Sequence, residues 1–241
     1  PDTKWQWYGE SLLGKDMLDD RYGLMKKYPD RFFDGDITDP DVLTSFNTRF
    51  HNSFDFVTSD CGVKVDDNYN DQEILTAKAF FGQAICTMMV LKKKGNAIMK
   101  YFTIFEDYSI NILYFLRLHF KEVMILKPET SRAANSEVYI LCKEFKGIDH
   151  DLINTLLARL GKTGTLKPMY PLAKSPFWDT EFLTSIYNAE LILAERQMDM
   201  LESALKMYRS PANTMKSNNG AKKIDEWLKI NKVISLKKPL L

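Results

Sequence analysis

Two apolar runs near the middle of the chain limit the folds that are open to this sequence. Residues 123–126 and 138–142 are rich in β-branched and apolar side chains, which predicts two buried strands. The polar stretch between them is too short for a crossover between parallel strands, which needs a dozen or more residues. The two strands therefore form an antiparallel hairpin. A lone glutamate, Glu137, lies where the second strand leaves an arginine-bearing loop, a pattern that is typical of an active site.

Strands and helices alternate before this hairpin. Strands are predicted over residues 54–59 and 96–102, and helices over residues 71–94, 108–120 and 149–160. Gly95 is the expected stop signal of the first helix. The order βαβαββ predicts an α/β fold with a largely parallel sheet, helices on both of its faces and a last strand antiparallel to the rest.

Three charged residues are expected to meet at one edge of that sheet. Asp60 follows the first strand, and Lys100 lies near the end of the second. Ligands of open α/β sheets bind beyond the carboxyl ends of the parallel strands. Glu137 begins the antiparallel strand, so it lies at the same edge. Each residue also has a structural reading, because an aspartate can cap a turn, a strand lysine can extend to solvent and a glutamate can form a surface salt bridge.

Composition bears on the compartment and on the partners. The formal net charge is +1, from 33 basic and 32 acidic residues, so a basic surface for nucleic acid would have to be local. Three cysteines and three histidines show no metal-ligand spacing, which predicts a reducing compartment and no metal site. No stretch approaches the roughly 18 apolar residues of a membrane span, and the first ten residues lack the apolar core of a signal peptide. We expect a soluble intracellular protein that does not bind membranes.

The last part of the chain is expected to be helical. Residues 161–176 are rich in glycine, proline, lysine and threonine and predict a connecting loop. One long helix or two shorter ones are predicted over residues 178–208, and a last helix near residues 224–230. The sequence is thus divided into an α/β domain at residues 1–165 and a C-terminal helical extension at residues 166–241.

Four motifs resemble those of one enzyme family. They are DGDITDP at residues 34–40, SDCG at 59–62, GNAIMKYF at 95–102 and KPETSRAANSEVY at 127–139. In order and spacing they resemble the cap-specific messenger-RNA ribose 2′-O-methyltransferases of the FtsJ-like group, and the closing LKKPLL resembles the end of eukaryotic-type cap enzymes. This resemblance implies a Rossmann-type class I methyltransferase domain, S-adenosyl-L-methionine as cofactor and capped RNA as substrate.

The resemblance also implies roles for single positions. Asp36 and Ile37 match the segment that contacts the adenine of the cofactor. Asp60 matches a catalytic aspartate that also lies near the methionine part of the cofactor. Lys100 and Glu137 match the lysine and the glutamate of a lysine-aspartate-lysine-glutamate catalytic tetrad.

Further positions concern the RNA. Ser131, Arg132 and Asn135 match a loop that lies along the RNA, although Arg132 could instead form a pair with a neighbouring glutamate. An acid that reads the 7-methylguanosine base is expected around residues 66–73. Three acids are candidates there: Asp66, Asp67 and Glu73.

The front of the domain departs from the family pattern. The glycine-rich cofactor loop and the first tetrad lysine should precede a strand aligned with residues 5–8, and Gly9, Gly14 and Gly23 do not form that motif. We expect an N-terminally incomplete domain, a partner segment that supplies the missing part, or a scaffold or RNA-binding module that has lost catalysis. A methyltransferase of ribosomal or transfer RNA is a further alternative, and a polymerase or capping complex is a candidate partner.

Overall fold

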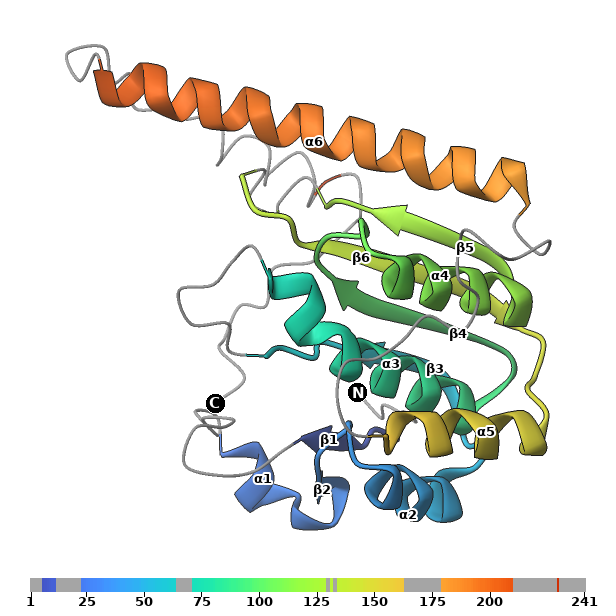
Figure 1. Cartoon of the computed structure of the whole chain (residues 1–241). Coiled ribbons are helices and arrows are strands. Elements are labelled where there is room, and N and C mark those ends of the chain that lie inside the picture. The colour runs from blue at the N-terminus through green and yellow to red at the C-terminus, as the bar shows by residue number, and fades with distance from the viewer. Residues whose placement is uncertain are drawn as a thin grey trace.

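The computed structural model describes residues 6–11, 23–63, 71–128, 131, 134–162, 179–209 and 229. Its helices and strands alternate along most of the chain (Figure 1). In order, they are β1 (Gly9–Ser11), α1 (Leu24–Lys27), the 3-10 helix η1 (Pro29–Arg31), β2 (Phe32–Asp34), α2 (Pro40–Phe50), β3 (Phe54–Ser59), α3 (Gln72–Val90), β4 (Leu91–Tyr101), α4 (Asp107–His119), β5 (Phe120–Leu126), β6 (Val138–Phe145), α5 (His150–Leu160) and α6 (Thr180–Arg209).

The main sheet has the strand order β3-β4-β6-β5. β3 and β4 are parallel, whereas β6 runs antiparallel to both of its neighbours. The predicted hairpin and its antiparallel last strand are therefore confirmed. β1 and β2 form a separate parallel pair.

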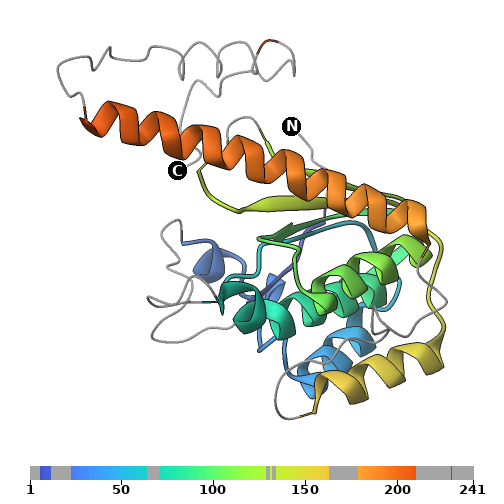
Figure 2. The same cartoon turned by 45° about the horizontal axis from the view of Figure 1, so that its top comes forward.

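One face of the main sheet is buried more deeply than the other. Along β4 the side chains alternate, so that Ala97, Met99 and Tyr101 are buried while Ile98 and Lys100 are only partly covered. The helices α2, α3, α4 and α5 contact one another in a single layer (Figure 2). The sequence predicted helices on both faces of the sheet. Among the described residues, α2, α3, α4 and α5 all cover the same face (Figure 2). The partly open face carries the Lys100 side chain.

Helix α3 forms the centre of the core. Fourteen of its 19 residues are buried, and it lies against the other helices of the layer and against β4. By length and composition α3 could cross a membrane, but 78% of that stretch is buried inside the protein. Because the core helix of a globular domain passes the same test, α3 is weak evidence for a membrane span.

The end of α3 differs from the sequence prediction. The helix ends at Val90 rather than at residue 94, and β4 starts directly at Leu91. Leu91 is fully buried and pairs with Phe54 of β3, and the Lys92 ammonium donates to the Asp55 carboxylate at 2.9 Å. These contacts with β3 favour an extended chain over another helical turn. Gly95 therefore lies inside a strand and does not end the helix.

The first strand is also shifted. The strand expected at residues 5–8 appears at Gly9–Ser11, and residues 6–8 have no regular structure. Trp7 packs on Tyr28 and Phe32, and Tyr8 packs on Phe50 with ring centroids 4.9 Å apart. These contacts hold the segment that leads into β1. Alternating aromatic residues are typical of a half-buried strand, but here their side chains pack on other rings outside a strand.

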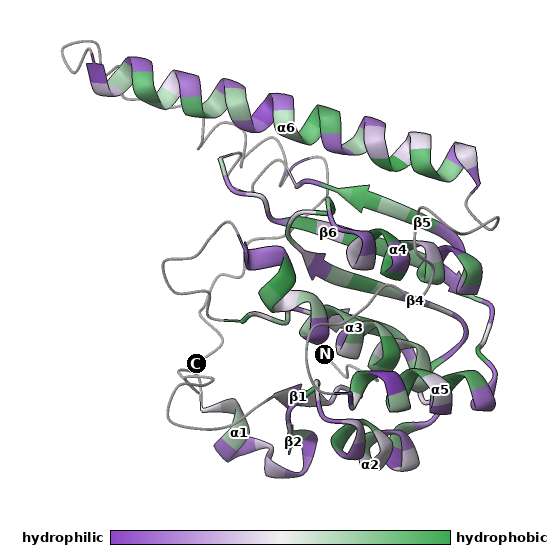
Figure 3. Cartoon of the chain, in the orientation of Figure 1, coloured by the Kyte–Doolittle hydropathy of each residue, from purple (hydrophilic) through white to green (hydrophobic). Residues whose placement is uncertain are grey.

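Helix α6 is one continuous helix, which decides between the two alternatives for residues 178–208. It runs past the β5 edge of the sheet (Figures 1 and 2). Phe182 and Ile186 near its start are buried in the core, whereas residues 198–209 are exposed. Hydrophilic and hydrophobic residues alternate along its length (Figure 3). Most of the expected connecting loop and of the last helix lie outside the described residues.

Candidate active site at the carboxyl edge of the sheet

An ion pair joins the first two of the predicted residues. The Lys100 ammonium, near the end of β4, contacts the Asp60 carboxylate, which follows β3. The Lys100 side chain is only 14% exposed, whereas that of Asp60 is 75% exposed. The ammonium also lies 5.7 Å from the ring centroid of Phe102, within the range of a cation–π contact. The lysine is thus held on two sides while the aspartate remains accessible to a ligand.

Glu137 reaches this pair through a tyrosine. Tyr139 lies opposite Lys100 in the β4–β6 ladder, so both side chains are on the same face of the sheet. The Tyr139 hydroxyl donates to Glu137 Oε1 at 3.2 Å. Burial, then Glu137 and Asp60, raise the pKa of Tyr139. The structure therefore gathers the three predicted residues at one edge, with Tyr139 between them.

The proposed adenine segment is a tight turn between β2 and α2. Asp36 Oδ1 accepts hydrogen bonds from the backbone N–H and the hydroxyl of Thr38, both at 2.8 Å. The carbonyl of Ile37 lies against Gly82 of α3 so closely that a Cβ at Gly82 would overlap it. The turn is thus shaped by Asp36 and docked on the core helix.

Two residues that the sequence analysis did not select connect this turn with the ion pair. Burial, then Asp36 and Asp34, raise the pKa of Glu10 to about 7. Burial and then Glu10 raise the pKa of the Cys61 thiol to about 11, while the Lys100 charge lowers it. β1 and β2 are paired in parallel, and Cys61, just after β3, lies within range of the Glu10 charge.

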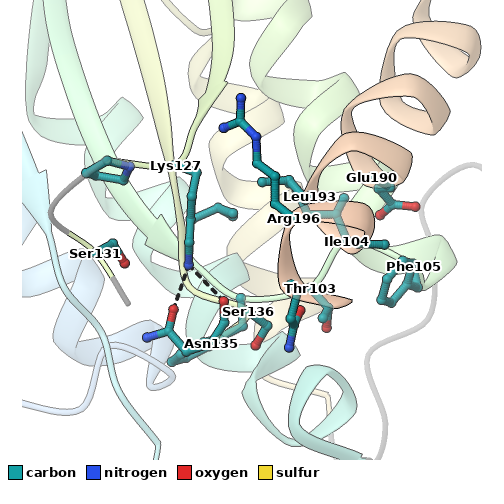
Figure 4. A pocket seen from close by; sticks show the side chains of 15 residues that line it. Thr103, Ile104, Phe105, Lys127, Ser131, Asn135, Ser136, Glu190, Leu193 and Arg196 are labelled. Carbon is teal, nitrogen blue, oxygen red and sulfur yellow. Dashed lines mark hydrogen bonds between the residues drawn. The ribbon is translucent and has the colours of Figure 1, made fainter. Parts of the chain in front are cut away.

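The predicted RNA loop lines a pocket beside this site (Figure 4). The pocket has a volume of about 310 Å³ and lies between the loop after β4, the β5–β6 loop and α6. Ser131 and Asn135 line it, and Gln197 of α6 donates to the Ala134 carbonyl at 3.1 Å. Arg132 lies outside the described residues.

Glu190 of α6 lines the pocket, and Glu73 contacts Phe105, another residue of its lining. Glu73 is buried, and its carboxylate accepts hydrogen bonds from the backbone N–H groups of Phe105 and Glu106 at 3.1 and 2.9 Å. It thus fixes the start of α4, which occupies both of its oxygens. Asp66 and Asp67, the other two candidates for a cap contact, lie outside the described residues. Burial and then Glu73 raise the pKa of Glu190, on α6, to about 7.

Tyr139 and Lys127 complete the list of residues that the sequence analysis missed. Both stand in the motif at residues 127–139, but no role was assigned to them. The strand register places Tyr139 opposite Lys100, and Lys127 donates hydrogen bonds into the loop that carries Glu137. The two-residue period of a strand could have pointed to Tyr139, because it follows Glu137 by two positions. In the described ranges, no three or more histidine, cysteine, aspartate or glutamate side chains are arranged to hold a metal ion.

Comparisons with known proteins identify the family. The profile of the FtsJ-like methyltransferases matches residues 3–145, more than half of the chain. An uncharacterized protein of Acanthamoeba polyphaga mimivirus, L511, is 29% identical over 97% of this chain and 31% of its own length. A probable methyltransferase of African swine fever virus, EP424R, is 30% identical over 96% of this chain and 60% of its own.

A cellular relative is also similar. The cap-specific mRNA (nucleoside-2′-O-)-methyltransferase 2 of Drosophila melanogaster is 27% identical over 87% of this chain and 32% of its own length. The chain thus spans between about a third and three fifths of the length of these relatives. The α/β fold with its antiparallel β6 and the match to the family profile agree: this chain belongs to the FtsJ-like methyltransferase family.

Proposed function

We propose that this protein is an S-adenosyl-L-methionine-dependent methyltransferase that modifies the ribose 2′-hydroxyl of the cap-proximal nucleotide of messenger RNA. The observation that carries the proposal is the Asp60–Lys100 ion pair, held beside Glu137 at the carboxyl edge of the sheet. The name of the Drosophila relative supports the substrate. Such a substrate would place the protein inside the cell, in the nucleus or the cytoplasm.

The chemistry of this edge suits the proposed cofactor. Asp36 follows β2 and Asp60 follows β3. Together with burial and Glu10, both carboxylates raise the pKa of the Cys61 thiol, so negative charge is concentrated at this edge. S-adenosyl-L-methionine would supply a methyl group on a positively charged sulfonium, together with a cationic amino group. Carboxylates stabilise such charges, and the turn at Asp36 and Ile37 would hold the adenine.

The residues of the site then have distinct tasks in the transfer. The ribose hydroxyl must be aligned for in-line attack and must lose its proton. In this proposal Lys100 takes the proton as the neutral amine, or stabilises the developing alkoxide as the ammonium, and Asp60 orients its side chain. Glu137 is the third charged residue of the proposed site. It is linked to the face that carries Lys100 through its hydrogen bond with Tyr139.

The RNA would lie across the β5–β6 loop. Ser131 and Asn135 line the pocket next to the ion pair, and Arg132 belongs to the same loop in sequence. At about 310 Å³ the pocket is at the small end of ligand sites, which suits one nucleotide rather than a longer segment. We propose that a nucleotide next to the acceptor ribose occupies it.

A transfer assay with matched RNAs tests this function. Short capped RNA, the same RNA with a 2′-deoxyribose at the first nucleotide, and uncapped RNA are each incubated with the protein and methyl-labelled cofactor. We expect label on the capped RNA and none on the deoxy variant. Equal labelling of uncapped structured RNA would instead indicate a ribosomal or transfer RNA substrate. Cofactor binding without transfer to any RNA would favour the inactive scaffold.

A further inference from the structure

One lysine closes the loop that carries Glu137. The Lys127 ammonium donates to the Asn135 carbonyl at 2.8 Å and to Asn135 Oδ1 at 2.6 Å (Figure 4). It also donates to the Glu137 carbonyl at 2.6 Å. A lysine ammonium has three N–H donors, so these bonds use all of them. All three acceptors are neutral oxygens. The lysine therefore acts here as a set of donors that fixes the chain, and not as one half of an ion pair.

The place of these bonds in the hairpin is informative. The backbone ladder between β5 and β6 ends at the pair Leu126–Tyr139. Lys127 is the next residue after β5, and Glu137 is the last residue before β6. The three bonds thus continue the hairpin beyond its last backbone pair. They tie the loop down where the Glu137 side chain leaves for the active site.

The surroundings strengthen this clamp. Burial lowers the pKa of Lys127, while the nearby Glu137 raises it. A partly buried hydrogen bond competes less with water and is stronger than an exposed one. The Glu137 carboxylate, in turn, accepts from the Tyr139 hydroxyl at 3.2 Å and from the Ser131 hydroxyl at 3.4 Å. Backbone and side chain of Glu137 are therefore held from two sides.

We propose that Lys127 is a positioning residue for methyl transfer: its three hydrogen bonds fix Glu137 against Tyr139, and thereby against the Asp60–Lys100 pair. The inference rests on the proposed function of this site. A direct RNA contact is the competing role for a lysine in this loop. It would require the ammonium to give up at least one of its three bonds, so the geometry favours positioning.

Kinetics of three variants test the proposal. Lys127→Ala removes the clamp, and Lys127→Arg keeps a cation with several donors. Lys121→Ala is the matched control, because Lys121 lies on β5, the strand that precedes Lys127, and bonds Glu144 of β6 at 2.7 Å at the other end of the hairpin. Each protein is assayed for kcat and for KM with capped RNA, and cofactor affinity is measured by calorimetry.

The expected result separates positioning from binding. Lys127→Ala lowers kcat about tenfold or more, because a small misplacement of a reacting group is costly. Its cofactor affinity stays within about threefold of the original protein, and its KM for RNA, whose proposed pocket Lys127 also lines, rises by a smaller factor than kcat falls. Lys127→Arg recovers part of kcat, and Lys121→Ala changes nothing. An unchanged kcat in Lys127→Ala would overturn the proposal, and so would a loss confined to KM.

Hydrogen exchange tests the clamp independently of activity. In Lys127→Ala, the backbone amides of residues 134–139 exchange faster than in the original protein, while Lys121→Ala leaves them unchanged. If the original protein transfers no methyl group to RNA, the proposed function fails, but this measurement still decides on the clamp. Unaltered exchange at residues 134–139 in Lys127→Ala would show that the three bonds do not hold the loop.

Discussion

Glu10 shows how single carboxyl groups respond to the crowded carboxyl edge. Its Oε1 atom is buried and has no hydrogen-bond partner in the part of the chain that the structure describes. Burial, Asp36 and Asp34 raise its pKa to about 7. In an unfolded chain a glutamate ionises near pH 4.5. The folded protein therefore binds the proton of the Glu10 carboxyl group more tightly than the unfolded chain does. The resulting stabilisation of the folded state is complete only below pH 4.5.

Glu10→Gln should consequently change the pH dependence of stability. As pH rises from 4.5 through 7, the original protein loses stability because Glu10 ionises against its surroundings. At pH 8 we expect the variant to be more stable by about 1–2 kcal/mol after allowance for solvent screening, and at pH 4.5 to be equal. Denaturant unfolding at both pH values measures this. If the difference in unfolding free energy between Glu10→Gln and the original protein were the same at pH 4.5 and at pH 8, the raised pKa of Glu10 would be contradicted.

At this scale the sequence predicted part of the site. Strand order was enough to expect Asp60, Lys100 and Glu137 at one edge, and the structure places them there. Their catalytic roles remain predictions. Glu10 and Lys127 were missed because their importance depends on side-chain contacts between segments distant in sequence or across a loop. Spacing alone does not contain that information.

At the scale of elements, the contact between α3 and the turn after β2 is decisive for the cofactor segment. Gly82 allows the helix to approach the Ile37 carbonyl directly. Any side chain there must push the helix or the turn away. The same turn carries Asp36, so the packing of a core helix and the shape of the proposed adenine site depend on one glycine.

Gly82→Ala should therefore disturb both the packing of α3 and the turn that carries Asp36. Overpacking against a backbone carbonyl costs typically 1–3 kcal/mol, so we expect a loss of about 2 kcal/mol in unfolding free energy together with weaker cofactor binding. Gly62→Ala is a control for stability, because a Cβ at Gly62 would meet no atom of the described residues within 4 Å. Thermal unfolding and calorimetry measure the two effects. Equal stability of both variants would argue against the close contact.

Elements were predicted better in their existence than in their ends. Residues 54–59 form β3 as expected, and the helices expected at 108–120 and 149–160 appear as Asp107–His119 and His150–Leu160. The helix expected at residues 71–94 is shorter, because Leu91 and Lys92 pair with β3. Such tertiary contacts override the helix signals of the local sequence.

At the scale of the whole molecule, α6 joins the C-terminal extension to the domain. Arg117 of α4 forms an ion pair with Asp179 at 2.8 Å, just before α6. Phe182 is 7% exposed and packs edge-on against Tyr114 with ring centroids 5.2 Å apart. The start of the helix thus belongs to the same core as the sheet. The division of the chain between residues 165 and 166 stays a prediction.

Phe182→Ala should loosen this attachment. Removal of a buried phenylalanine costs about 3–5 kcal/mol, so a large drop in unfolding free energy is expected. Tyr187→Ala is a matched control on the same helix, since Tyr187 is 66% exposed and its loss should cost less than about 0.5 kcal/mol. Denaturant unfolding compares the two. Similar values for both variants would mean that α6 is not anchored through Phe182.

The central claim, that Lys100 carries the proton step of methyl transfer, is tested most directly by Lys100→Ala. We expect transfer to capped RNA to fall about 100-fold or more while cofactor affinity stays within about threefold, since the loss falls on the transition state. Lys92→Ala is the matched control, because Lys92 lies on the same strand and pairs with Asp55 at 2.9 Å. It should keep full activity. If Lys100→Ala retained more than about a tenth of the original rate, the claim would be contradicted.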